Sequence, residues 1–250
     1  MKNKKTIMFF SSLLIVIFHL WINIFDRTNS LFQIENFLRQ TCFIGVDIFF
    51  FLSSYSISKK DIKDYKGFIE SRFKKIYLIF IIFSIIASIY FKWDIKTFIL
   101  TITGINLFLK GGGSFLWFIP AIMIIYIFLP LYNKIEKKYN KITHVITGVI
   151  WTLFTIIISK YTTYTKIFIF TNRIPIILIA SILSKYQTIE KLNKKQYITI
   201  TTILIITGLF IQYSLNNIIF EYIKDIYYIS SIPLSIGLIL LINLIPTNKI

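Results

Sequence analysis

The stretch IVIFHLWINIF, residues 15–25, places one ionisable side chain, His19, inside an apolar run. His19 lies 12 residues after Ile7, which is about 18 Å along a helix. The next apolar run, CFIGVDIFFFLSSYSIS, carries Asp47 near its start, so a chain that crosses back brings this carboxylate to a similar depth. A carboxylate facing an imidazole fixes its tautomer and makes it a base for a hydroxyl group. The pair therefore predicts general-base chemistry; the alternative is a His–Asp contact that only joins two helices.

A second group of chemical interest is the basic cluster in ESRFKKIYLIF, residues 70–80. Arg72 and Lys75 are three residues apart, so they share one face of a helix. Arginine offers a two-pronged fork to a phosphate, and lysine offers a point charge. The pair is a candidate phosphate site. On the sequence alone, an ordinary basic collar beside a membrane span is the favoured reading.

Other polar residues within apolar runs are candidates for a polar cavity. Ser53 is small enough to let a helix or a ligand approach closely. Trp117 fits an interfacial anchor, and Arg173 needs a partner or an aqueous cavity. No metal is expected, because the remaining histidine, His144, begins a different run and is interpreted as an interfacial residue. The single cysteine, Cys42, excludes disulfides and thiolate clusters.

The elements that position these residues are long apolar blocks. The chain has 250 residues, 56% of them hydrophobic, and a mean hydropathy of +0.71. Such blocks approach the length needed to cross about 30 Å of hydrocarbon. We expect an all-α fold, a polytopic transmembrane helical bundle of about eight or nine spans, forming a single integral-membrane domain over residues 1–250. The predicted spans are 6–25, 43–58, 76–91, 115–132, 142–159, 167–184, 197–213 and 226–246.

The charges predict an orientation. The net charge of +17 is explained by lysines between spans, which meet anionic membrane lipids, so nucleic acid is not an expected partner. Most basic residues fall on one side if the N-terminus is cytoplasmic and the short segment 97–109 does not cross the membrane. If it crosses, the lysine-rich loops 133–141 and 185–196 move outside. We therefore expect 97–109 to be short or re-entrant, and the first apolar run to be a retained helix.

The order of these motifs resembles acyltransferase family 3, the integral-membrane O-acyltransferases of bacterial surface glycans. Its first helix ends in a histidine, here LLIVIFHLW, and is followed by a pattern like G-V-D-x-F-F-x-L-S-G-[FY], here GVDIFFFLSSY. A basic R-x-x-R follows, here RFKK. Later come an L-W-[FY]-[LI] helix with a downstream Tyr, here LWFIPAIMIIYIFLP with Trp117 and Tyr126, and an R-x-P-x-F-L-x-G helix, here RIPIILIAS. Order and spacing agree over residues 6 to about 184.

The resemblance implies an acyl donor, usually acetyl-CoA, and an acceptor hydroxyl on a saccharide or lipid-linked glycan, in the bacterial cytoplasmic membrane. It assigns His19 as the catalytic base with Asp47 beside it, and Arg72 with Lys75 as contacts for the donor phosphates. No metal is implied. The remaining positions, expected to line a substrate or polar cavity, are Ser53, Trp117, Tyr126 and Arg173.

The chain departs from the family pattern in several places. Lys75 replaces the second arginine and loses the fork, Ser54 replaces a glycine, and Ser114 stands where many members have a histidine. The last family helix is expected to be missing. Two alternatives therefore stay open: a carrier or flippase for a lipid-linked saccharide, for which matching halves are not found, and an inactive truncated acyltransferase.

Overall fold

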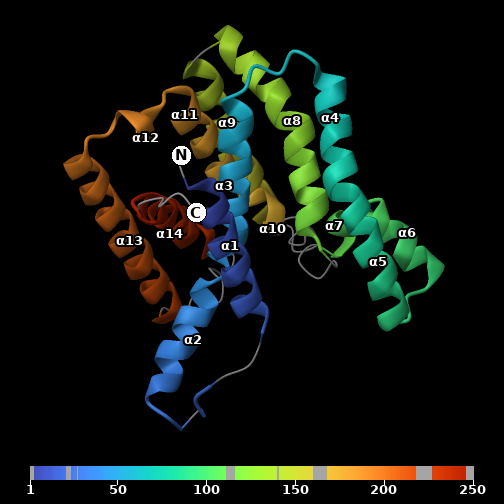
Figure 1. Ribbon diagram of the computed structural model, residues 1–250, viewed down its shortest axis with the longest axis horizontal. Coiled ribbons are helices and arrows are strands. Elements are labelled where there is room, and N and C mark those ends of the chain that lie inside the picture. Colours follow the sequence, from blue (N-terminus) through green and yellow to red (C-terminus); the bar gives the residue numbers. More distant parts are fainter. Residues whose placement is uncertain are drawn as a thin grey trace. The chain divides into compact units, whose positions relative to one another are not determined.

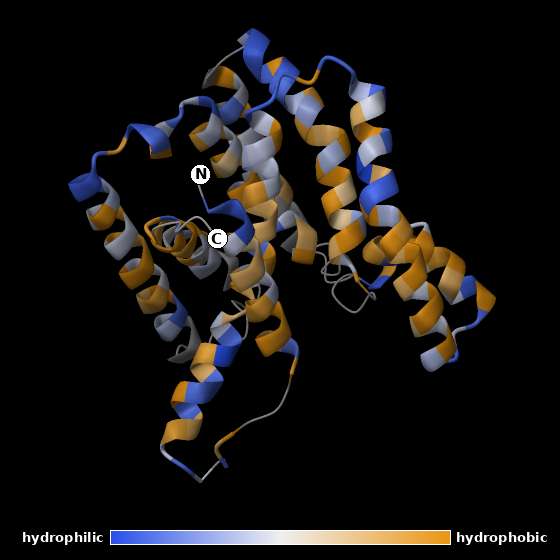
Figure 2. Cartoon of the chain, viewed as in Figure 1, coloured by the Kyte–Doolittle hydropathy of each residue, from blue (hydrophilic) through white to orange (hydrophobic). Residues whose placement is uncertain are grey.

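The structure is a computed structural model that describes residues 3–20, 24–26, 28–110, 116–139, 141–159, 168–217 and 227–245. All regular elements in these ranges are helices, so the predicted all-α class is confirmed (Figure 1). Hydrophilic residues concentrate between the helices α3 (Ile44–Ser58) and α4 (Tyr65–Arg72) and around α12 (Thr188–Lys191), whereas apolar residues follow the lengths of the long helices (Figure 2). Ser114 lies outside the described residues.

The chain divides into two compact units, each described here by itself. The first unit consists of Met1–Tyr55 and Ile182–Ile250, and the second of Ser56–Ser181. The first contains α1 (Lys4–His19), α2 (Leu31–Thr41), most of α3 (Ile44–Ser58), α12 (Thr188–Lys191), α13 (Lys194–Asn217) and α14 (Tyr227–Asn243). The second contains α4 (Tyr65–Arg72), the π-helix η1 (Phe73–Tyr77), α5 (Leu78–Tyr90), α6 (Ile95–Ile102), α7 (Ile105–Lys110), α8 (Phe118–Tyr139), α9 (Lys141–Ser159), α10 (Phe168–Thr171) and most of α11 (Ile174–Lys185).

Fewer helices than predicted are long enough to cross a membrane. Within the described ranges, four qualify by length and composition: Leu31–Ser58, Tyr65–Tyr90, Phe118–Tyr139 and Lys194–Ser214. The predicted count of eight or nine spans is therefore not confirmed. The first helix illustrates the difference, because its 16 residues reach only about 24 Å, short of the hydrocarbon thickness.

Two segments differ from the expected pattern in an informative way. The polar stretch LFQIENFLRQT, which lies between two predicted spans, forms α2 and continues through a turn into α3. The short segment 97–109 is not one helix, because Gly104 adopts a φ of +76° between α6 and α7. Only glycine enters this region readily. At about 12 Å or less, neither short helix reaches across a membrane, as expected for a segment that does not cross.

In the first unit, α1 and α3 approach each other closely at Gly45. The hydroxyl of Ser11 donates to the carbonyl of Gly45 at 2.5 Å. A Cβ added to Gly45 would lie 2.6 Å from the Ser11 carbonyl oxygen and 2.8 Å from the Cγ1 of Ile15. The absence of a side chain at Gly45 therefore fixes the distance between the helix that carries His19 and the helix that carries Asp47.

The same device joins α13 and α14. A Cβ at Gly208 would lie 2.5 Å from Leu234 Cγ, and one at Gly237 would lie 2.8 Å from Ile205 Cγ1. Small residues let two membrane helices approach until their backbones nearly touch. The start of the chain is tied to the end of α14, because the side-chain amide of Asn3 donates to the carbonyls of Ile242 and Ile245.

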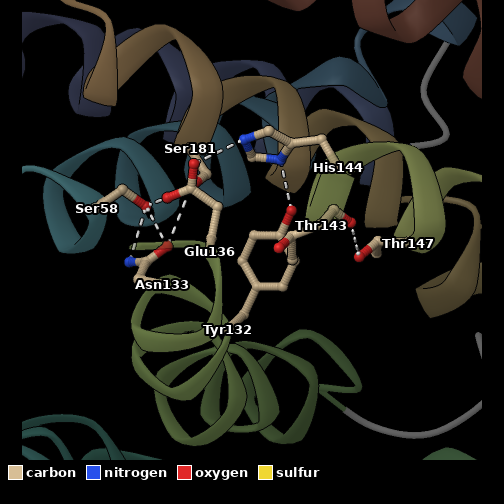
Figure 3. Close-up of polar contacts among 8 residues, drawn as sticks. All are labelled: Ser58, Tyr132, Asn133, Glu136, Thr143, His144, Thr147 and Ser181. Atoms are coloured by element: carbon tan, nitrogen blue, oxygen red, sulfur yellow. Dashed lines mark hydrogen bonds and ion pairs between the residues drawn. The ribbon is translucent and has the colours of Figure 1, made fainter. Parts of the chain in front are cut away.

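In the second unit, a buried polar clasp joins α8 to α9. His144 of α9 lies between two residues of α8: its Nδ1 is 2.6 Å from the Tyr132 hydroxyl and its Nε2 is 3.0 Å from Glu136 Oε1 (Figure 3). Glu136 is only 3% exposed. Because buried polar groups are costly when unsatisfied, these bonds hold the two helices in one register. His144, expected from the sequence to be an interfacial residue, is thus a half-buried side chain with two hydrogen-bond partners.

We expect Gly45→Ala to destabilise the protein by about 1–3 kcal/mol, because the new methyl group must displace backbone and a branched side chain. The matched control is Gly148→Ala in α9, where a Cβ meets nothing within 4 Å. That change should be neutral or stabilising by up to about 1 kcal/mol, since alanine is the better helix former. Thermal unfolding in one detergent compares the two. Equal shifts in the same direction would contradict the close α1–α3 contact.

We also expect His144→Ala to lower the free energy of unfolding by about 1–3 kcal/mol, because it leaves the Glu136 carboxylate buried without this partner. Ile146→Ala, at a position 52% exposed on the same helix, should change it by less than about 0.5 kcal/mol. The check is the difference between the two unfolding midpoints. Similar values would show that the clasp contributes nothing to stability.

Candidate functional site

The eight residues singled out in the sequence are divided between the two units. His19, Asp47 and Ser53 belong to the first unit. Those in the second unit are Arg72, Lys75, Trp117, Tyr126 and Arg173. Within the second unit the structure brings four of the predicted residues together as two pairs that had not been predicted, as described below. Ser53 is half-buried on α3.

His19 is the last residue of α1 and is exposed. Its Nδ1 lies 2.9 Å from the carbonyl oxygen of Ile15. A carbonyl only accepts, so Nδ1 must carry the proton. In the neutral ring the lone pair of Nε2 then points away from the helix bond and can accept a proton from a ligand. The backbone therefore performs the task predicted for Asp47, which is to select the tautomer.

Asp47 lies in the first turn of α3 and is completely buried. Among the described residues, the ring hydrogen bond of His19 is made to Ile15 and not to this carboxylate. The two residues are nevertheless linked through the backbone contact described above, since Ile15 packs against Gly45, two residues before Asp47. The start of a helix favours a negative charge. The structure thus places a buried acid close to the α1–α3 contact.

Arg72 is held by aromatic rings. Its guanidinium carbon lies 5.2 Å from the ring centre of Phe68 and 5.4 Å from that of Tyr126. Its Nε is buried and makes no hydrogen bond to any described residue. Stacking against ring faces leaves the edges of a guanidinium for an anion. Arg72 and Tyr126, which were both predicted to take part in polar recognition, are therefore in contact with each other.

The turn that follows Arg72 is a π-helix, η1. Single π-turns inside α-helices are rare and are frequent at functional sites. The wider turn alters the spacing of side chains, so residues three apart no longer align as in an α-helix. Lys75 is exposed, whereas Arg72 is half-buried against α8. Arg72 and Lys75 therefore do not share one helix face in the way that regular α-helical spacing predicts.

An apolar cavity of about 210 Å³ lies beside η1. Phe73 and Tyr77 line it from η1, Gly104 from the break between α6 and α7, and Met123 and Ile127 from α8. The Tyr77 hydroxyl donates to the Ile102 carbonyl, so this wall carries little unsatisfied polarity. Along α8 the lining runs from Ile119 to Ile127, which is about 12 Å. The cavity has room for a slender, largely apolar group.

Arg173 and Trp117, both predicted cavity residues, also meet. The guanidinium carbon lies 5.0 Å from the ring centre of Trp117. The Nη1 of Arg173 donates to the carbonyl of Ile169, one helical turn earlier. The expected need of this arginine for a partner is therefore met by a ring face and a backbone carbonyl.

A polar pocket that was not singled out in the sequence lies near the lysine-rich end of α8. Its volume is about 40 Å³. The polar lining residues are Ser58, Lys60, Asp61, Asn133, Lys134 and Lys137. The sequence signal was present, since the lysines at 59–66 and 133–141 had been used to assign topology. The sequence alone did not predict that the connection between α3 and α4 packs against α8.

Comparison with known proteins gives one match. A family model described as an acyltransferase domain matches residues 9–250. No curated protein and no solved structure matches the chain. The family match runs through both compact units and includes the exposed imidazole, the stacked arginines and the apolar cavity. The chain belongs to acyltransferase family 3.

Proposed function

We propose that this protein is a membrane-bound O-acyltransferase that transfers an acyl group, in the simplest case acetyl, from acyl-CoA to a hydroxyl group of a cell-surface or lipid-linked saccharide. The observation that carries the proposal is the tautomer of His19. An exposed imidazole with Nδ1 bonded to its own helix presents Nε2 as a proton acceptor, in a chain whose family performs acyl transfer. The setting is a bacterial cytoplasmic membrane, with the N-terminus in the cytoplasm.

The reaction places a proton on His19 and a new ester on the acceptor. Nε2 removes the proton of the attacking hydroxyl as its oxygen bonds to the thioester carbonyl carbon. The carbon–sulfur bond then breaks, and the thiolate of coenzyme A takes up the proton. The Ile15 carbonyl keeps the ring oriented throughout. Asp47 acts in this proposal as a positioning residue through the close contact of α1 and α3 at Gly45.

The donor is bound by the second unit in this proposal. Arg72, supported by the rings of Phe68 and Tyr126, contacts the diphosphate, and the exposed Lys75 adds positive charge. The arm that links the diphosphate to the thioester occupies the apolar cavity beside η1. The paired Trp117 and Arg173 are assigned to the acceptor. No step in this scheme uses a metal.

We expect His19→Gln and His19→Ala to reduce kcat for acyl transfer by about a hundredfold or more, because a general base contributes factors of this size. The KM for acetyl-CoA should stay within about twofold, since His19 does not bind the donor. Transfer of labelled acetyl groups to envelope glycan by protein in membranes measures both constants. Ser12→Ala, an exposed change on the same helix, is the control. Unchanged kcat in correctly inserted His19 variants would end the general-base assignment.

We expect Arg72→Lys to raise the KM for acetyl-CoA by about tenfold, while kcat changes less. Lysine keeps the charge but lacks the planar guanidinium that lies near both rings and presents a fork. Tyr126→Leu should act in the same direction, because it removes one of the stacking partners. Lys74→Met, an exposed change in η1, is the control for charge alone. If Lys74→Met and Arg72→Lys raise KM equally, the site is a diffuse basic collar.

A further inference from the structure

The small pocket at the lysine-rich end of α8 carries an excess of positive charge. It lies between the α3–α4 connection and α8, with three lysines and one carboxylate in its lining. Lys137 Nζ lies 2.6 Å from Asp61 Oδ1. The hydrogen bond from Lys137, with further attraction from Lys63 and Lys134, holds the pKa of Asp61 below its usual value. Asp61 is therefore ionised at neutral pH and offsets the charge of one lysine. The positive charges of the other two lysines in the lining remain.

Two neutral polar residues of the pocket lining, Ser58 and Asn133, are held in place by Ser181, which is not part of the lining. Ser58, Asn133 and Ser181 bond to one another, with the Ser58 and Ser181 hydroxyl oxygens 2.9 Å apart (Figure 3). The Asn133 side-chain nitrogen donates to Ser58 at 3.2 Å, and its oxygen accepts from Ser181 at 3.1 Å. An amide nitrogen has two hydrogens, so Asn133 retains a donor for a second acceptor. About 40 Å³ is room for one small group.

The pocket and the Arg72 site lie on the same face of α8. Tyr126, against which Arg72 stacks, and Pro130, Asn133 and Lys137 follow the spacing i, i+4, i+7, i+11. Residues at this spacing form one stripe along a helix. Tyr126 and Asn133 are separated by about 10 Å along the axis. The hydroxyl of Tyr65 donates to the Ile127 carbonyl at 2.8 Å and thereby fixes the start of α4 against the same helix.

We propose that this pocket binds a phosphate monoester of the acyl donor, the 3′-phosphate of coenzyme A, while Arg72 binds its diphosphate. The inference rests on the proposed function. A donor with a diphosphate and a separate phosphomonoester presents two anionic groups, and the second unit offers two cationic sites on one stripe. An anionic lipid headgroup carries similar chemistry, but a single headgroup has no use for both sites. The Ser58, Asn133 and Lys134 side chains are specificity groups for the monoester.

The test compares binding of coenzyme A and 3′-dephospho-coenzyme A to the full chain in nanodiscs of zwitterionic lipid, by calorimetry. We expect the wild type to bind coenzyme A about tenfold more tightly, as for one charge-assisted contact. Lys134→Met should reduce this preference to about twofold or less and leave the affinity for 3′-dephospho-coenzyme A unchanged. Lys138→Met, which removes an exposed lysine of α8 that is not part of the pocket lining, should keep the full preference.

The outcomes separate this inference from the proposed function. If both compounds bind the wild type equally, the 3′-phosphate site is wrong and the donor assignment stands. If neither binds, the donor assignment fails and takes this site with it. A third arm adds vesicles containing phosphatidylglycerol. If Lys134→Met weakens association with these vesicles but leaves the nucleotide preference unchanged, the pocket is a lipid headgroup site, which overturns the proposal.

Discussion

The candidate site depends on one constraint: an ionisable side chain that serves a substrate must find a partner that does not neutralise its chemistry. Ring faces and backbone carbonyls meet this condition. Arg72 lies on two aromatic rings, Arg173 on Trp117 and a carbonyl, and His19 on the carbonyl of Ile15. A carboxylate partner would have satisfied the same groups more strongly, but it would also have consumed the charge or the lone pair that a substrate needs.

Helix irregularities decide where these groups point. The π-turn after Arg72 separates it from Lys75, and Gly104 interrupts the segment between α5 and α8. Both irregularities border the apolar cavity. A regular helix would pack a continuous apolar surface against its neighbours, whereas a break in the helix leaves part of the space between helices unfilled. The cavity is therefore a product of two local departures from α-helical geometry, and not of any single large residue.

Part of this could be read from the sequence. Long apolar blocks determine the helical class, and the contacts of Arg72 with Tyr126 and of Arg173 with Trp117 join residues selected by motif. The predicted number of spans is not confirmed within the described ranges, because hydropathy measures composition and not where a helix ends. α2 was not predicted, because LFQIENFLRQT mixes apolar with polar residues and is too short to span a membrane. The His144 clasp was also missed, because it depends on the register of two helices, which single-chain periodicity does not contain.

The make-up of the first unit has a consequence for biogenesis. Its two parts, Met1–Tyr55 and Ile182–Ile250, are separated by the whole of the second unit. At ribosomal rates of about 5–20 residues per second, roughly 6 to 25 s pass between their emergence. During that interval α1 and α3 exist without α13 and α14, and Asn3 lacks the carbonyls of Ile242 and Ile245. The early helices of the first unit therefore complete their packing only after the last helices have been synthesised.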